Sequence, residues 1–229
     1  MEADCWRGGN VIPVMIVPVL GRYDLLHRLL GTIDEPVGEI LIIDNGDELR
    51  PADLATYPNV RLVSSPSNLG IATSWNLGIK MYPRASGWVI LGADIWFQPG
   101  RLGFWFSRTA EDQITTGAQP PWACFHLGRE VVERVGLFCE RFHPAYFEDN
   151  DYEQRANAAG IKIFHPDVHI GHDNSAVLMS SPELQERNRA TFMKNQAVLA
   201  ERWDGLKAGE IPNFEDWSLR ERCEYSWDG

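Results

Sequence analysis

Four carboxylates fall within six residues of the segment YFEDNDYEQRANAAG: Glu148, Asp149, Asp151 and Glu153. Adjacent carboxylates disfavour joint ionisation, and burial beside the two aromatic residues that precede them would raise a pKa further. A carboxylate with a raised pKa in a cleft is a competent general base. The segment equally fits an acidic first helical turn, which the helix macrodipole favours. An ion pair of Asp151 with Arg155 is expected in either case, so spacing leaves both interpretations open.

Asp94 ends the apolar stretch VILGAD and is followed closely by a Pro-Gly turn. One interpretation is a turn or capping aspartate. The other is a metal ligand, because Mg²⁺ or Mn²⁺ needs only one or two protein carboxylates when a substrate diphosphate supplies further oxygens.

Three histidines, His165, His169 and His172, lie in FHPDVHIGHDNSA together with Asp167 and Asp173. This density of imidazole and carboxylate groups is compatible with metal binding by at least one histidine, or with one exposed and one packed histidine. A strand would put residues 165, 167 and 169 on one face, and 172 lies beyond a glycine. We therefore do not expect all three imidazoles to converge.

Apolar strands and helices that must position these groups alternate in the first half of the chain. The expected strands span 11–20, 39–47, 59–65 and 86–94, and the expected helices span 22–33 and 67–82. This order predicts an α/β fold with a mostly parallel sheet. Ligands of such sheets bind outside the carboxyl ends of the strands, near Asp44, Asn68, Gly70 and Asp94.

The second half has a less regular pattern. We expect helices at 99–110, 129–138 and from Asn150 or Asp151 to about 160, with a strand at 120–128 and a strand and its exit at 161–172. A long amphipathic helix is expected over 181–203, with Ser181 as N-cap and Pro182 in its first turn.

Composition narrows the function classes. The chain has 229 residues and a formal net charge of −11, which disfavours non-specific nucleic-acid binding and adsorption to anionic lipid, although a local basic patch would be compatible with it. Its four scattered cysteines contain no CxxC pair and predict reduced thiols in a cytoplasm. The most apolar run has ten residues and two prolines, so neither a transmembrane segment nor a signal peptide is expected.

Five segments, in order between about residues 11 and 175, together resemble a family of enzymes. They are VPVLGRYDLLHRLLGTI, ILIIDNGD, NLGIATSWNLGIK, LGADIWFQPGRL and VVERVGLFCERFHPAYFEDNDYEQRANAAGIKIFHPDVHIGH. The chain is thereby similar to family 2-like inverting glycosyltransferases of the GT-A fold, with a Rossmann-like sheet flanked by helices. The resemblance implies a glycosyltransferase domain over 1–180, with a nucleotide-binding half at 11–100 and an acceptor-side half at 101–180, and a C-terminal helix and tail over 181–229.

The resemblance also implies residue roles. Asp149 would be the catalytic base, with Glu148 as its neighbour and acceptor contact. Asp94 would bind Mn²⁺ or Mg²⁺ and the donor, with His172 as the late metal ligand and His169 as fallback. The implied nucleotide-sugar pocket contains Pro18, Arg22, Asp44, Asn68, Gly70 and Asn76. Candidate walls for sugar or acceptor are Trp75, Trp96 and Trp122, each of which could equally be a core residue. The donor would be a UDP-, dTDP- or GDP-linked sugar and the acceptor a hydroxyl group.

Two positions depart from the family pattern. Gly92 stands where a fuller DxD motif has its first acidic residue, which weakens the implied metal dependence or shifts it onto His172. Cys139 replaces an aspartate. A nucleotidyltransferase-type enzyme and a non-catalytic nucleotide- or sugar-binding module remain alternatives. The first would usually carry a Gly-rich basic loop after its first strand, where this chain has one glycine and one arginine.

Overall fold

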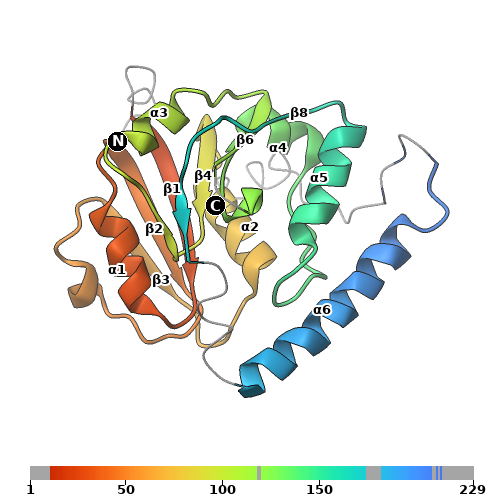
Figure 1. Ribbon diagram of the computed structural model, residues 1–229, viewed down its shortest axis with the longest axis horizontal. Helices are drawn as coiled ribbons and strands as arrows, with labels where there is room; N and C mark the ends of the chain where they lie inside the picture. The colour runs from red at the N-terminus through yellow and green to blue at the C-terminus, as the bar shows by residue number, and fades with distance from the viewer. Residues whose placement is uncertain (1–10, 118–119, 174–181, 208–209, 211, 213–229) are drawn as a thin grey trace, which may run out of the picture.

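A seven-stranded, mostly parallel sheet forms the centre of the computed structural model (Figure 1), which describes residues 11–117, 120–173, 182–207, 210 and 212. The strand order is β3-β2-β1-β4-β7-β6-β8, and β7 alone runs against its two neighbours. Its strands are β1 (Ile12–Val19), β2 (Val37–Asp44), β3 (Val60–Ser64), β4 (Gly87–Leu91), β6 (Gln113–Thr116), β7 (Cys124–Gly128) and β8 (Lys162–Phe164). The predicted α/β class with a mostly parallel sheet is confirmed.

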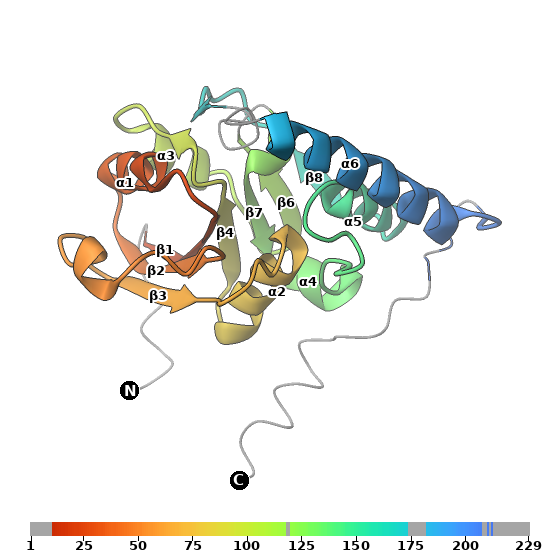
Figure 2. The same ribbon diagram turned by 90° about the horizontal axis from the view of Figure 1, so that it is seen from below.

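Helices cover both faces of this sheet (Figure 2). The helices are α1 (Tyr23–Gly31), α2 (Ile71–Met81), α3 (Arg101–Phe106), α4 (Arg129–Val135), α5 (Glu148–Ala158) and α6 (Pro182–Trp203), with 3-10 turns η1 (Pro51–Leu54) and η2 (Pro121–Ala123). One apolar cluster joins α1 and α3 to the sheet, and a second joins α2, α4 and α5 to its other face. Strand β1 is buried throughout because successive side chains, such as Ile16 and Val17, enter opposite clusters.

A second, two-stranded sheet lies outside the main one. It pairs β5 (Ile95–Trp96) with β9 (Gly171–His172) in antiparallel register. The segment 161–172, expected to contain a strand and its exit, contains β8 and β9, which belong to different sheets. Pairing Ile95 with His172 brings the chain that follows β8 against the segment that follows β4.

Several predicted boundaries differ from those of the structure. Helix α5 begins at Glu148, so the expected cap at Asn150 or Asp151 is wrong, and strand β6 was missed. Helix α6 begins within one residue of its expected start, while its expected cap, Ser181, lies outside the described residues. The helix is not amphipathic in the expected sense, because Asn195 is the only fully buried residue among its described side chains.

Candidate active site

A pocket of about 330 Å³ opens beside the carboxyl ends of β1 and β4. Residues from both halves of the chain line it, together with one from α6. They are Pro18, Ile71, Trp75, Leu91, Gly92, Asp94, Pro120, Trp122, Ala123, Tyr146, Phe147, Glu148, Asp149, Asn150, His172 and Phe192. Three polar groups predicted separately from the sequence, Asp94, Asp149 and His172, thus share one pocket.

Asp94 and His172 meet through the small β5–β9 sheet. The Oδ1 atom of Asp94 lies 3.2 Å from Nε2 of His172. The backbone oxygen of Asp94 accepts hydrogen bonds from the Asp173 N–H and from the Arg28 guanidinium, which also pairs with the Asp173 carboxylate. Gly171 permits this contact, because a Cβ there would lie 2.0 Å from the Trp96 ring. Sheet pairing and side-chain bonds therefore hold the pair in place.

The Asp94–His172 pair fits a divalent cation only with help from a ligand. One carboxylate and one imidazole are acceptable donors for Mn²⁺ or Mg²⁺. Within the described residues, no group of three or more His, Cys, Asp or Glu side chains could hold a metal. A cation at this pair would need further oxygens, which the diphosphate of a nucleotide sugar can supply.

Glu148 and Asp149 enter the pocket from the first turn of α5. The two residues before them, Tyr146 and Phe147, have left-handed backbone conformations, with φ of 79° and 72°. Such conformations cost on the order of 1–3 kcal/mol each in residues other than glycine. Contacts with the surrounding residues must therefore stabilise this turn. The turn sets the position of Glu148 and Asp149 at the start of α5.

The two acids differ in electrostatics. Burial raises the pKa of the Glu148 carboxyl to about 8, with a further contribution from the neighbouring Asp149 charge. Its Oε2 atom is buried and has no hydrogen-bond partner among the residues that the structure describes. Burial also raises the pKa of Asp149, while hydrogen bonds from backbone N–H groups, including that of Asn150 at 2.8 Å, lower it. At neutral pH Glu148 is therefore largely protonated and able to donate a hydrogen bond, whereas Asp149 is the more readily ionised acid.

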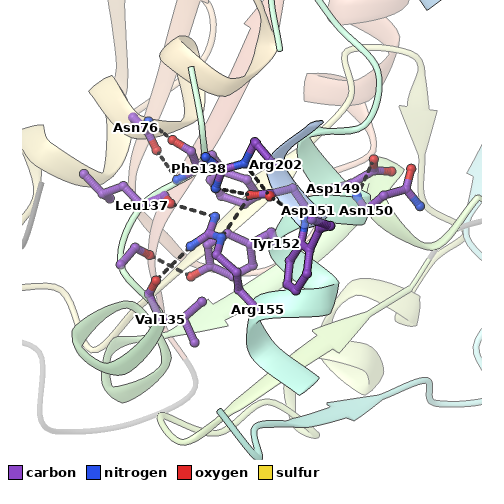
Figure 3. A network of polar contacts seen from close by, with 12 residues as sticks. Asn76, Val135, Leu137, Phe138, Asp149, Asn150, Asp151, Tyr152, Arg155 and Arg202 are labelled. Carbon is purple, nitrogen blue, oxygen red and sulfur yellow. Dashed lines mark hydrogen bonds and ion pairs between the residues drawn. The ribbon is translucent and has the colours of Figure 1, made fainter. Parts of the chain in front are cut away.

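The other two acids of this segment, Asp151 and Glu153, make structural contacts, and Figure 3 shows those of Asp151 with Arg155 and Arg202. Asp151 is fully buried and accepts hydrogen bonds from Arg155 and Arg202, each at 2.9 Å, and from the indole of Trp203 at 3.1 Å. Arg155 also donates to the backbone oxygens of residues 135 and 137. The predicted pair of Asp151 with Arg155 is confirmed, and it is a buried one. Glu153 accepts a hydrogen bond from the Trp122 indole and is not a freely solvated residue.

Aromatic side chains form much of the pocket wall. Trp75 and Trp122 line it with Tyr146, Phe147 and Phe192. Both tryptophans also pack edge-on against Phe125, so they serve the core and the pocket together. Trp96 is absent from the lining and lies near His169 instead. Flat aromatic faces beside polar groups suit the apolar faces of a sugar ring.

Asp44 and Asn76, both expected in the nucleotide pocket, are buried and bonded to the scaffold. Asp44 accepts hydrogen bonds from the Tyr23 hydroxyl and from the backbone N–H groups of residues 46, 48 and 49. Burial acts to raise the pKa of Asp44, but these donors lower it overall. Asn76 brackets Phe138, donating to its oxygen and accepting from its N–H at 2.9 Å each. Neither side chain lines the described pocket.

Asn68, Gly70 and Arg22 lie outside the pocket lining, whereas Pro18 contributes to it. Gly70 has φ of 81°, and a Cβ there would lie 2.8 Å from the His143 ring, so the turn packs closely against the loop leading to α5. The Asn68 backbone oxygen is 3.0 Å from Nε2 of His143. Arg22 is exposed and paired with Asp24, and the charges of Asp94 and Asp173 also raise its pKa.

The three histidines border a second hollow of about 430 Å³. It is lined by Thr116, Gly117, His165, Pro166, Asp167, Val168, His169, Ile170 and His172. All three border this surface because the irregular chain between β8 and β9 runs along it. Within the described residues no three such side chains could hold a metal, so this shared surface does not contradict the expectation that the three imidazoles would not converge. His172 borders both hollows, and His165 is hydrogen-bonded to Thr116.

Sequence reasoning missed the contribution of α6. Phe192 lines the pocket, and its ring lies 4.8 Å from that of Phe147 between centroids. An exposed phenylalanine on a polar helix, 41% exposed here, is the one signal that could have indicated this role.

Comparisons with known proteins show that this fold is shared with glycosyltransferases of known structure. No model of a protein family matches the chain. A protein from Leishmania donovani named galactofuranosyl glycosyltransferase is 24% identical over an alignment 297 positions long, which covers 92% of this chain and 66% of that protein. The chain thus spans just under two thirds of that relative's length.

Solved structures share the fold at low sequence identity. A mannosyltransferase from Pyrobaculum calidifontis, in complex with GDP-Man and Mn²⁺, superposes with a TM-score of 0.63 and 20% identity, covering 86% of this chain and 65% of that one. A glucosyl-3-phosphoglycerate synthase from Mycobacterium tuberculosis, in complex with Mn²⁺, UDP and glucosyl-3-phosphoglycerate, gives a TM-score of 0.58 and 15% identity, covering 88% and 81%. The predicted GT-A fold is confirmed by these similarities.

Proposed function

We propose that this chain is an inverting glycosyltransferase that moves a sugar from a nucleoside-diphosphate donor to an acceptor hydroxyl. The observation that carries the proposal is the convergence of Asp94, His172 and Asp149 on one aromatic-walled pocket. The glycosyltransferase name of the Leishmania donovani relative supports it, as does the fold shared with enzymes solved with GDP-Man or UDP and Mn²⁺.

Asp94 and His172 would hold a divalent cation together with the donor diphosphate. When bound, such a cation neutralises charge that develops on the leaving diphosphate. Arg22 contributes positive charge close to the same place, since Asp94 and Asp173 both influence its guanidinium. Asp44 and Asn76 would support the donor site indirectly by fixing the loop at 46–49 and the segment near Phe138.

Asp149 would act as the general base. Its carboxylate takes the proton of the acceptor hydroxyl as that oxygen attacks the anomeric carbon, and the bond from that carbon to the diphosphate oxygen breaks. Attack from the face opposite the leaving group inverts the anomeric configuration. Glu148, protonated at neutral pH, would donate a hydrogen bond to the acceptor rather than compete for its proton.

The experiment is a release assay with a panel of UDP-, GDP- and dTDP-sugars in the presence of Mn²⁺, with water or simple glycosides as acceptors. We expect release of the nucleoside diphosphate from at least one donor. Release of pyrophosphate would instead indicate a nucleotidyltransferase. Absence of any release, together with absence of nucleotide binding, would contradict the proposal and leave a binding module on the same fold.

A further inference from the structure

We propose that Asn195 of α6 is a positioning residue that holds the turn carrying Glu148 and Asp149. The inference rests on the proposed function and extends it to a helix whose role the sequence did not reveal. Asn195 is fully buried, although most described side chains of α6 are exposed or half-exposed. Among the described residues its Nδ2 atom has hydrogen-bond partners, whereas its Oδ1 atom is buried without one. The partners of Nδ2 therefore identify what the side chain holds.

Those partners all belong to the loop before α5. The Nδ2 of Asn195 donates to the backbone oxygen of Ala145 at 2.8 Å, and the oxygens of His143 and Tyr146 each lie 3.5 Å away. Three carbonyl groups therefore surround one amide nitrogen. The side chain bridges α6 to the residues immediately before the left-handed pair Tyr146 and Phe147.

The same face of α6 contacts this loop at two further points. Residues 188, 192 and 195 follow helical spacing and so share one face. Asn188 accepts a hydrogen bond from the Tyr146 hydroxyl. The Phe192 ring lies 5.5 Å from that of Tyr146, measured between centroids. All three residues of this face therefore contact the loop and turn that precede the proposed base.

Helix α6 also holds α5 beyond the base. Arg202 and Trp203 bond to Asp151, two residues after Asp149. Figure 2 shows α6 running alongside α5. The base-bearing turn is therefore fixed on both sides by one helix, while the Asp94–His172 pair is held independently by the β5–β9 sheet. Loosening Asn195 should disturb the base without disturbing the donor diphosphate site.

Hydrogen–deuterium exchange on the full chain tests the structural step. The variants are Asn195→Ala and Asn195→Asp, which both remove the Nδ2 donor, and the control is Lys194→Ala at the exposed neighbouring position. We expect amides of residues 143–150 to exchange about tenfold faster in the first two variants, with those of α1 unchanged. Unchanged exchange at 143–150, or an equal increase in α1, would overturn the inference.

Donor kinetics test the functional step. In Asn195→Ala we expect kcat for nucleoside-diphosphate release to fall by about tenfold or more, while KM for the donor stays within about twofold. A KM rise equal to the fall in kcat, or no change in either, would overturn the positioning role. If the wild type released no diphosphate at all, the proposed function would fail, whereas the exchange result would still decide whether Asn195 holds the turn.

Discussion

Glu148 and Asp149 are neighbours in sequence but have different environments. Glu148 is 6% exposed, and its Oε2 atom has no hydrogen-bond partner among the described residues, whereas the Asn150 N–H donates to Oδ1 of Asp149 at 2.8 Å. Burial raises the pKa of both carboxyl groups, and that of Glu148 to about 8. Two carboxyl groups with different pKa values can divide acid and base tasks at one pH, which supports the proposal that Asp149 is the base and Glu148 the hydrogen-bond donor.

Asp149→Asn removes the proposed base and keeps the side-chain size. We expect kcat to fall by about 100-fold or more, since general base catalysis contributes about 10²–10⁴-fold. Nucleotide binding with Mn²⁺ should persist, because Asp94 and His172 are untouched. The measurement is steady-state diphosphate release beside a calorimetric titration. A folded variant that retains full rate would refute the assignment of the base.

Glu148 makes the stability of the protein depend on pH. Its pKa rises from 4.5 to about 8 on folding, so the folded state binds a proton that the unfolded state has lost between those values. Folding stability should therefore fall as pH rises through this range, by up to about 1.4 kcal/mol per pH unit. Glu148→Gln removes the titrating group, so its stability should fall less.

Chemical denaturation of both proteins at pH 5 and pH 8 gives the comparison. The stability difference between Glu148→Gln and wild type should shift in favour of the variant at pH 8. Parallel pH dependence of the two proteins would show that Glu148 ionises near its ordinary pKa.

At the scale of elements, α5 and α6 depend on one buried carboxylate. Asp151 pairs with Arg155 four residues later, and both side chains are 0% exposed. Arg129 and Glu133 of α4 have the same spacing, but their side chains are 33% and 49% exposed. The two pairs share their spacing and an N···O distance of 2.9 Å, with the charges in opposite order, and they differ in burial. The exposed pair therefore serves as the reference for the buried one.

Asp151→Ala should destabilise the protein by about 3–5 kcal/mol, because it leaves buried guanidinium groups without this carboxylate. Glu133→Ala should cost about 0–1 kcal/mol, as exposed pairs do. Urea unfolding followed by tryptophan fluorescence measures both changes in stability. Failure of Asp151→Ala to fold would also be consistent with the predicted large loss of stability. Similar small losses in the two variants would contradict the anchoring role of Asp151.

The sequence predicted those elements that have long apolar patterns. Strand β1 was found because it is a continuous apolar run, and helix α1 was found because its buried leucines recur at helical spacing. Strand β6, whose sequence is QITT, was missed because four mainly polar residues contain no such pattern. The β5–β9 pair has only two residues in each strand, so nothing local indicated that Ile95 pairs with His172.

The candidate site was predictable in its residue types more than in its contacts. Asp94 was predicted from its place at the end of an apolar strand and Asp149 from its place in an acidic segment, and both predictions also used the resemblance to a family. For Asp44, the sequence could not distinguish a carboxylate that faces a ligand from one that binds the backbone of its own loop. Asn195 lay in a polar helix without apolar periodicity, and its importance depends on a loop about 50 residues earlier.

At the scale of the whole molecule, the two halves of the chain bring residues from separate elements to one pocket. The first half supplies Pro18 and Asp94, and the second supplies Asp149 and His172, while α6 closes the wall with Phe192. The described residues contain no helix long and apolar enough to cross a membrane. The central claim is that this shared pocket binds a nucleoside diphosphate through a cation.

Titration calorimetry of UDP, GDP and dTDP tests that claim most directly. Each nucleotide is measured with Mn²⁺ and with a chelator, using the wild type, Asp94→Ala and the surface control Glu133→Ala. We predict that at least one nucleotide binds the wild type and the control in Mn²⁺, and that chelator or Asp94→Ala weakens this binding by about tenfold or more. Absence of binding by all three nucleotides, or binding that is equal with chelator and in Asp94→Ala, would contradict the account.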